Sequence, residues 1–244
     1  MKRDFKRSQT QLSSHHAMTT IIERTERFVR TALADVDGSH DWWHIHRVRL
    51  TARALAREEG ADIELVELAA LLHDVADWKY SGAPGAGADA ARAFLIGEHY
   101  DEAKIEAICD IIANMGFKDS LNADEASARA RARLASNVEF QCVQDADRLD
   151  AIGAIGIGRT FCFGGAKKNP MHVPGVEPLV DMTMKEYMER NAERPNTTIN
   201  HFAEKLLKLK NLMNTESAKK RAEKRHETMV WFLERFMREW DGEE

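Results

Sequence analysis

The stretch from Leu68 to Asp77 constrains the fold of this chain more than any other. It opens with an apolar run, Leu68 to Leu72, that leads directly into His73 and Asp74. An aspartate is almost never fully buried unless it is paired or bound to a metal. A helical run that ends in an adjacent imidazole and carboxylate therefore needs partners from elsewhere in the chain.

The spacing of proline and glycine favours helices. The 244 residues include only 5 prolines and 14 glycines, most of them gathered in two loops at 81–87 and 164–182. The segments between these loops show no β-branched alternation of the kind that strands require. We predict an all-α fold, a compact multi-helix bundle with long C-terminal helices. The expected helices cover about 19–34, 41–59, 62–79, 88–98, 101–114, 124–134, 138–163, 183–193, 198–213 and 215–240.

The same pattern predicts the domain organisation. Residues 1–18 are polar and aperiodic, so we expect a flexible N-terminal extension. Residues 19–244 are expected to form a single domain, because 43% of the chain is hydrophobic and can build a core. The apolar face of the last helix fits either that core or a second subunit, so a homodimer stays open. This face consists of Met229, Phe232, Leu233, Phe236 and Trp240.

Charge and cysteine content narrow the class of protein. The net charge is −5 with neutral histidines, so a broad positive field for nucleic acid is absent and we expect no such partner. Three cysteines without metal-ligand spacing indicate a reducing compartment. No apolar run reaches the roughly 18 residues of a membrane span, and the first residues lack the apolar part of a secretory signal. We expect a cytoplasmic protein with no membrane partner.

The second predicted helix supplies a candidate partner for His73 and Asp74. Helical spacing puts His44 and Arg47 on one inward face. An inward histidine is either a hydrogen-bonded core residue or a metal ligand. His46 points about 200° away from His44, so a regular helix cannot present both rings to one ion. Just before this helix, Asp41 reads as its N-cap, and His40 can face a neighbouring cleft.

A second acidic cluster lies at residues 143–151. Asp147 shares a helical face with Asp150 and precedes a segment of small apolar residues. Asp145 lies about 200° from Asp147 and faces elsewhere. An acidic helix start is often only a complement to the helix dipole, and this reading suits Asp145 better than Asp147.

The candidate set is therefore two imidazoles and two carboxylates, from His44, His73, Asp74 and Asp147. Mixed nitrogen and oxygen ligands suit Mn²⁺, Fe²⁺, Co²⁺, Ni²⁺ or Zn²⁺ better than Ca²⁺, and they leave positions open on a six-coordinate ion. Such an ion can lower the pKa of a water and hold a phosphoryl oxygen. No single helix carries the set, so three helices must converge.

These residues resemble the HD-domain superfamily of metal-dependent phosphohydrolases, in particular its small stand-alone bacterial members. The matching segments are His44-Ile45-His46-Arg47-Val48, Ala70-Leu71-Leu72-His73-Asp74 and Asp145-Ala146-Asp147-Arg148-Leu149, in that order. The resemblance covers about residues 20–240 and implies that His44, His73, Asp74 and Asp147 are the metal ligands. It implies one divalent ion, Mn²⁺ before Fe²⁺, Co²⁺, Ni²⁺, Zn²⁺ or Mg²⁺. Two-metal members carry extra histidines between the HD pair and the last Asp, and this chain has only His99 there.

The resemblance also implies a reaction. We expect hydrolysis of a phosphate ester or anhydride in a small phosphorylated substrate, most plausibly a nucleotide. Asp77 is expected to accept a proton from water, and Lys79 and Arg47 to meet phosphate. Each of these residues also has a structural alternative. Asp77 can be a surface acid, Lys79 a cation in the last turn of a helix, and Arg47 a partner in a salt bridge. A non-catalytic HD scaffold and a nuclease-type phosphodiesterase remain the alternatives. Further candidates for substrate contacts are Lys167, Lys168, Lys205, Lys208, Phe117, Lys118, Phe161 and Phe163.

Overall fold

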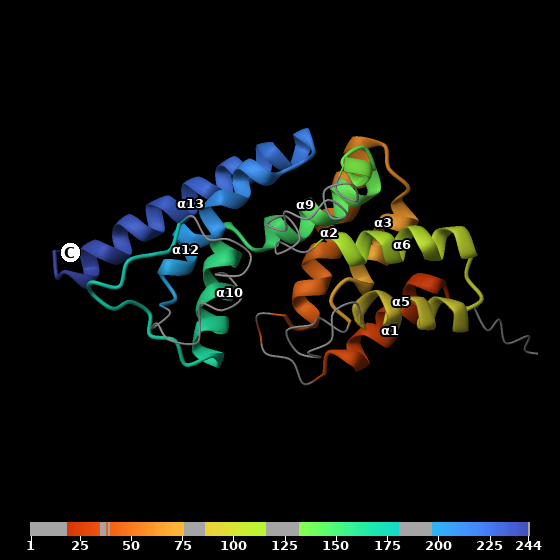
Figure 1. The fold of residues 1–244 in the computed structure, drawn as a ribbon, viewed down its shortest axis with the longest axis horizontal. Coiled ribbons are helices and arrows are strands. Elements are labelled where there is room, and N and C mark those ends of the chain that lie inside the picture. The colour runs from red at the N-terminus through yellow and green to blue at the C-terminus, as the bar shows by residue number, and fades with distance from the viewer. Residues whose placement is uncertain are drawn as a thin grey trace, which may run out of the picture.

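The regular elements that the structure describes are all helices. The computed structural model describes residues 19–34, 38, 40–75, 86–115, 132–180 and 197–243, and no strand occurs among them. The prediction of an all-α fold is confirmed, whereas the extension 1–18 and most of the helices expected at 124–134 and 183–193 lie outside the described residues. The elements (Figure 1) are α1 Ile21–Ala32, α2 Trp42–Glu59, α3 Ile63–Leu72, α5 Ala86–Gly97, α6 Glu102–Asn114, α9 Val138–Asp150, α10 Gly153–Ala166, α12 Asn200–Glu204, the 3₁₀ helix η1 Leu206–Leu212 and α13 Glu216–Trp240.

Side-chain caps fix where the helices begin. The Asp41 carboxylate accepts hydrogen bonds from the backbone amides of Trp43 and His44, at 3.0 and 3.1 Å. Asp62 caps α3 in the same way, and α2 ends at Gly60, which adopts the left-handed φ of 76° that favours glycine. These caps satisfy amides that have no partner within the helix. The predicted cap at Asp41 is confirmed, and it places His44 in the first turn of α2.

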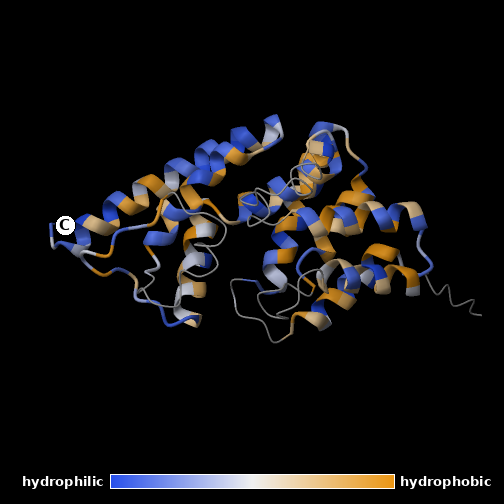
Figure 2. Cartoon of the chain, in the orientation of Figure 1, coloured by the Kyte–Doolittle hydropathy of each residue, from blue (hydrophilic) through white to orange (hydrophobic). Residues whose placement is uncertain are grey.

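The core lies where α2, α3 and α9 meet. α2 packs against both α3 and α9, while α1 and α6 cover α3. The run from Leu68 to Leu72 is fully buried, which accounts for its unbroken apolar character. Figure 2 shows apolar residues on the surfaces where these helices meet and hydrophilic residues on the outside of α13. This packing brings the N-terminal end of α2 and the C-terminal end of α3 to one side of α9.

One charged residue interrupts the buried face of α3. Glu67 is buried and forms ion pairs with Arg49, at 2.7 Å, and with Arg53, at 3.2 Å. Arg49 also pairs with Glu26 of α1 at 2.8 Å. A buried carboxylate is stable only when it is paired and hydrogen-bonded. The network therefore joins α1, α2 and α3, and it fixes α2 relative to α3.

α3 is shorter than expected. It ends at Leu72, and residues 73–75 form a turn, so the predicted continuation to about residue 79 is wrong. His73 and Asp74 consequently lie at the C-terminal end of the helix and not within it.

The predicted helix at 138–163 is divided in two. α9 ends at Asp150 and α10 begins at Gly153, which has a left-handed φ of 77°. A Cβ at Gly153 would lie 2.9 Å from the Cβ of Arg225 in α13. Arg225 also donates a hydrogen bond to the Leu149 carbonyl at the end of α9. The break therefore depends on a glycine conformation and on a close contact with a helix 70 residues away, and the local pattern did not reveal it.

We expect Gly153→Ala to destabilise the protein by about 1–3 kcal/mol, the usual cost of a left-handed φ at a residue other than glycine. Gly158 is the matched control, because it lies inside α10 with nothing within 4 Å of an added Cβ. Gly158→Ala should stabilise by about 0.5–1 kcal/mol through its higher helix propensity. Urea unfolding of both variants measures the difference, and equal stability of the two would contradict the observed break.

The C-terminal region also departs from the expected pattern. The single helix predicted at 198–213 is wrong, since α12 ends at Glu204 and a 3₁₀ helix follows. Side chains of α12 form hydrogen bonds with the loop that precedes it. Asn200 donates to the Val176 carbonyl at 2.8 Å, and Glu204 accepts from the Leu179 amide at 3.2 Å. These tertiary contacts outweigh the helical propensity of the segment.

α13 is long, as predicted, and packs on its own chain. Met229 is fully buried. The rings of Phe232 and Phe236 contact Phe161 of α10, with centroids at 5.9 and 6.1 Å. Of the two alternatives left open for this face, packing within the chain is therefore observed for most of it. Among the described helices, none is both long enough and apolar enough to cross a bilayer.

Candidate metal centre

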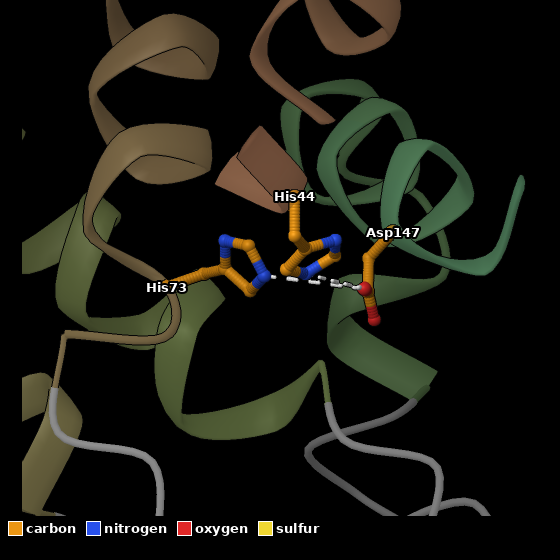
Figure 3. A group of neighbouring side chains, drawn as sticks. All are labelled: His44, His73 and Asp147. Atoms are coloured by element: carbon orange, nitrogen blue, oxygen red, sulfur yellow. Dashed lines mark ion pairs between the residues drawn. The ribbon is translucent and has the colours of Figure 1, made fainter. Parts of the chain in front are cut away.

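Three helices bring two imidazoles and two carboxylates together. His44 Nε2 lies 3.4 Å from Asp74 Oδ2 and 3.5 Å from Asp147 Oδ1. His73 Nε2 lies 3.5 and 3.9 Å from the same two oxygens. Figure 3 shows both rings directed at the Asp147 carboxylate. These atoms face one another across a space with the dimensions of a metal site.

The outer nitrogen of each ring fixes its tautomer. His44 Nδ1 lies 2.8 Å from Asp150 Oδ2, and His73 Nδ1 lies 2.9 Å from the Ala70 carbonyl oxygen. Both oxygens are acceptors, so both Nδ1 atoms carry the proton and both Nε2 atoms present a lone pair. The Ala70 carbonyl belongs to the last turn of α3, where carbonyls lack helical partners. The end of α3 therefore sets the orientation of His73.

The two Nε2 atoms identify the kind of group that the site accommodates. Both are buried, and neither has a hydrogen-bond partner among the described residues. A buried acceptor without a partner is costly, and two of them directed at the same two carboxylates are well explained by a cation. His44, His73 and Asp147 each offer an atom within 4.8 Å of the others. Nitrogen and oxygen donors in this combination suit a divalent transition metal.

The buried carboxylate of Asp150 contacts His44 on the side of the ring that faces away from the other candidate ligands. Asp150 accepts hydrogen bonds from Arg47 Nε at 2.8 Å and Nη2 at 3.0 Å, and its Oδ2 lies 3.1 Å from Arg159 Nη1. Burial alone would raise the pKa of Asp150, yet the hydrogen bonds from His44 and Arg47 hold that pKa well below its usual range. Asp150 is therefore ionised, and its charge fixes the ring of His44.

The pKa values of His44 and Asp147 are shifted by the charged groups around them. Burial and Arg159 oppose protonation of His44, but the hydrogen bond to Asp150 and the nearby negative charge of Asp74 raise its pKa above the usual value. Burial likewise raises the pKa of Asp147, but the two nearby imidazoles outweigh it and the net shift is downward. The site thus favours an ionised Asp147 and attracts positive charge.

The predicted site residues fall into three groups. The structure brings together His44, His73, Asp74 and Asp147. Arg47 lies beside them, with its guanidinium on Asp150 in the salt-bridge arrangement that was one of its alternatives. Asp77 and Lys79 lie outside the described residues.

The residues set aside by helical phase are indeed elsewhere. The Asp145 carboxylate accepts hydrogen bonds from the backbone amides of Asn214 and Thr215, and it thereby holds the start of α13. The ring of His46 lies against Trp42 and Trp43, with centroids at 6.0 and 5.8 Å. His99 is exposed at the end of α5.

Sequence reasoning missed the roles of Asp150 and Arg159. Asp150 follows Asp147 by three residues and shares its helical face, which was visible in the sequence. Arg159 lies on α10, beyond the break, so its position next to Asp150 depends on a turn that the sequence did not reveal. His40, which had no assigned role, lies with its ring centroid 5.8 Å from that of His44.

Fold and site together define the class, an all-α protein that gathers two His and two Asp for a divalent ion. Comparison with known proteins agrees. The model of the HD domain matches residues 42–152, which contain all four residues. The uncharacterized protein YpgQ of Bacillus subtilis is 33% identical over 231 residues, covering 90% of this chain and 94% of YpgQ.

Solved structures match over most of the chain. A protein from Lactobacillus plantarum superposes with a TM-score of 0.77 and 36% identity, covering 92% of this chain and 100% of the other. An HD-superfamily hydrolase from Bacillus thuringiensis has a TM-score of 0.65 and 41% identity, with 90% and 96% coverage. B. subtilis YpgQ in complex with ADP has a TM-score of 0.64 and 29% identity, with 88% and 97% coverage. The chain belongs to the HD-domain family, and it is a metal-dependent phosphohydrolase.

Proposed function

We propose that this protein hydrolyses a phosphate ester or anhydride bond in a nucleotide, with one Mn²⁺ ion held by His44, His73, Asp74 and Asp147. The observation that carries the proposal is the pair of buried Nε2 atoms without hydrogen-bond partners, both directed at the same two carboxylates. Two neutral imidazoles and two carboxylates would leave positions for water and a phosphoryl oxygen on a six-coordinate ion.

The nucleotide is the finer part of the proposal. It is supported by the relative YpgQ, whose crystal structure contains ADP and matches 88% of this chain. The surroundings of the four ligands also suit an anion, because Arg47 and Arg159 both lie on Asp150 beside His44. Two guanidinium groups next to a metal site can offset charge on a phosphate during its transfer.

Different residues of the chain would have different roles in the reaction. When bound, the ion lowers the pKa of a water and polarises the phosphorus–oxygen bond. Asp150 keeps His44 in the tautomer that presents Nε2, and the Ala70 carbonyl does the same for His73. We assign Asp77 as the acceptor of the water's proton, and Lys79 and Arg47 as phosphate contacts. A proton acceptor within hydrogen-bond reach contributes about 10²–10⁴-fold to such reactions.

We expect purified protein to release phosphate or pyrophosphate from at least one nucleoside phosphate when Mn²⁺ is present. A chelator should abolish this release, and added Mn²⁺ should restore it, because the imidazoles alone supply no activated water. A panel of nucleoside mono-, di- and triphosphates with a generic phosphomonoester measures the preference. No release from any nucleotide, while calorimetry shows Mn²⁺ bound, would contradict the nucleotide proposal.

A further inference from the structure

One face of α10 carries three residues that can contact a substrate. Arg159, Phe163 and Lys167 recur at intervals of four residues, and this spacing places them in a row along the helix. Successive members are separated by about 6 Å along the helix axis, at a rise of about 1.5 Å per residue. The row is therefore about 12 Å long and has a cation at each end of an aromatic ring.

The inner end of this row touches the metal centre. Arg159 lies 3.1 Å from Asp150, which in turn contacts His44. A second contact places the middle of the row. The ring of His40 lies 5.8 Å from the ring of His44 and 6.2 Å from that of Phe163, between centroids. Two independent contacts thus direct this face of α10 toward the site.

The two phenylalanines of α10 have different surroundings. Phe161 packs among the rings of Phe202, Phe232 and Phe236, with centroid distances of 5.9 to 6.5 Å. It is therefore part of the core between α10, α12 and α13. The ring of Phe163 instead lies near the ring of His40 and the ammonium group of Lys167. Of the two α10 rings among the candidates for substrate contacts, only Phe163 lies near His40 and thus on the side of the candidate metal centre.

Lys167 shows that the face of Phe163 is within reach of solvent. Its side chain is exposed, and its Nζ lies over the ring of Phe163 at 5.7 Å from the centroid. A hydrated ammonium group can approach only a ring face that the protein core does not cover. A flat aromatic ligand can occupy the same face, with the flexible lysine displaced outward.

We infer that Phe163 and Lys167 form the base-binding part of the substrate site. The base stacks on Phe163 beside His40, Lys167 closes over it as a cation, and the phosphate groups extend along α10 past Arg159 toward the four ligand residues. The inference rests on the proposed function and adds to it a ligand class, a nucleotide whose aromatic base contributes to binding. Base–aromatic stacking is tolerant of base identity, so the site is expected to accept more than one base.

Calorimetric titration separates base binding from phosphate binding. The probes are α,β-methylene-ADP and its ring-free counterpart methylenediphosphonate, each with Mn²⁺ and intact protein. Phe163→Leu keeps apolar volume but removes the aromatic face, so it should weaken binding of the nucleotide analogue by about tenfold. It should leave methylenediphosphonate within about twofold of wild type. Lys167→Gln should weaken the nucleotide analogue by about two- to fivefold.

Two control variants account for general effects. Cys162→Ala changes an exposed neighbour of Phe163 on another face of α10, and Lys224→Gln removes an exposed charge from α13. Both should bind the two probes as wild type does. Suppose that wild type binds and hydrolyses nucleotides. If Phe163→Leu then binds the nucleotide analogue as well as wild type does, or loses affinity for both probes equally, the inference is overturned while the proposed function stands. If wild type neither hydrolyses nucleotides nor binds the analogue, the proposed function fails and the inference with it.

Discussion

Replacing His44 with alanine is expected to abolish hydrolysis and to weaken binding of Mn²⁺ by more than about 100-fold. Loss of a residue that merely supports a metal ligand already costs 10–100-fold in affinity or activity, and His44 faces the site directly. Its Nε2 lies within 3.5 Å of both candidate carboxylates. Calorimetry with Mn²⁺ measures the affinity, and phosphate release with the best nucleotide measures the activity.

The chain offers a control two residues away. His46 belongs to the same helix, but its ring lies against those of Trp42 and Trp43. His46→Ala should therefore keep metal affinity and activity within about twofold of wild type, apart from the few tenths of a kcal/mol that surface changes usually cost in stability. His44 is fully buried, so its replacement can also destabilise the fold. His73→Ala therefore serves as a second ligand variant, at the end of a helix. Metal affinity that survives in both ligand variants would refute the site.

The grouping of the four candidate ligands was largely predictable because these residues carry strong local signals. A histidine and an aspartate that follow the buried run from Leu68 to Leu72 are conspicuous. Helical phase then separated His44 from His46 and Asp147 from Asp145. Phase holds within an unbroken helix, and these residues lie inside or directly against the regular helices α2 and α9, whose first turns are capped by Asp41 and Asn137.

What the sequence did not predict depends on contacts between distant segments. The end of α3 at Leu72 and the break before Gly153 were both missed, because apolar periodicity says where a helix can continue and not where it stops. The break turns α10 so that Arg159 returns to Asp150 and Phe163 faces His40. The positions of Arg159 and Phe163 near the candidate ligands were therefore hidden, although the candidate ligands themselves were visible.

Replacing Asp150 with asparagine is expected to weaken Mn²⁺ binding by about 10–100-fold without touching any ligand. The amide has the size of the carboxylate but loses the charge that receives His44 Nδ1–H and the guanidinium groups of Arg47 and Arg159. Stability should also fall, toward the lower end of the 3–5 kcal/mol typical of a buried pair that loses one partner, because Arg47 keeps partial contact with water. Urea unfolding and calorimetry at one temperature measure the two effects.

Asp145→Asn is the matched control, because it makes the same change five residues earlier in the same helix. Asp145 is equally buried, but its partners are the amides and side chains of Asn214 and Thr215 at the start of α13. Losing these hydrogen bonds should destabilise the protein by about 1–3 kcal/mol and leave metal affinity unchanged where the protein remains folded. If Asp150→Asn weakens Mn²⁺ binding no more than Asp145→Asn does, then Asp150 stabilises the fold only and does not position His44 for the metal.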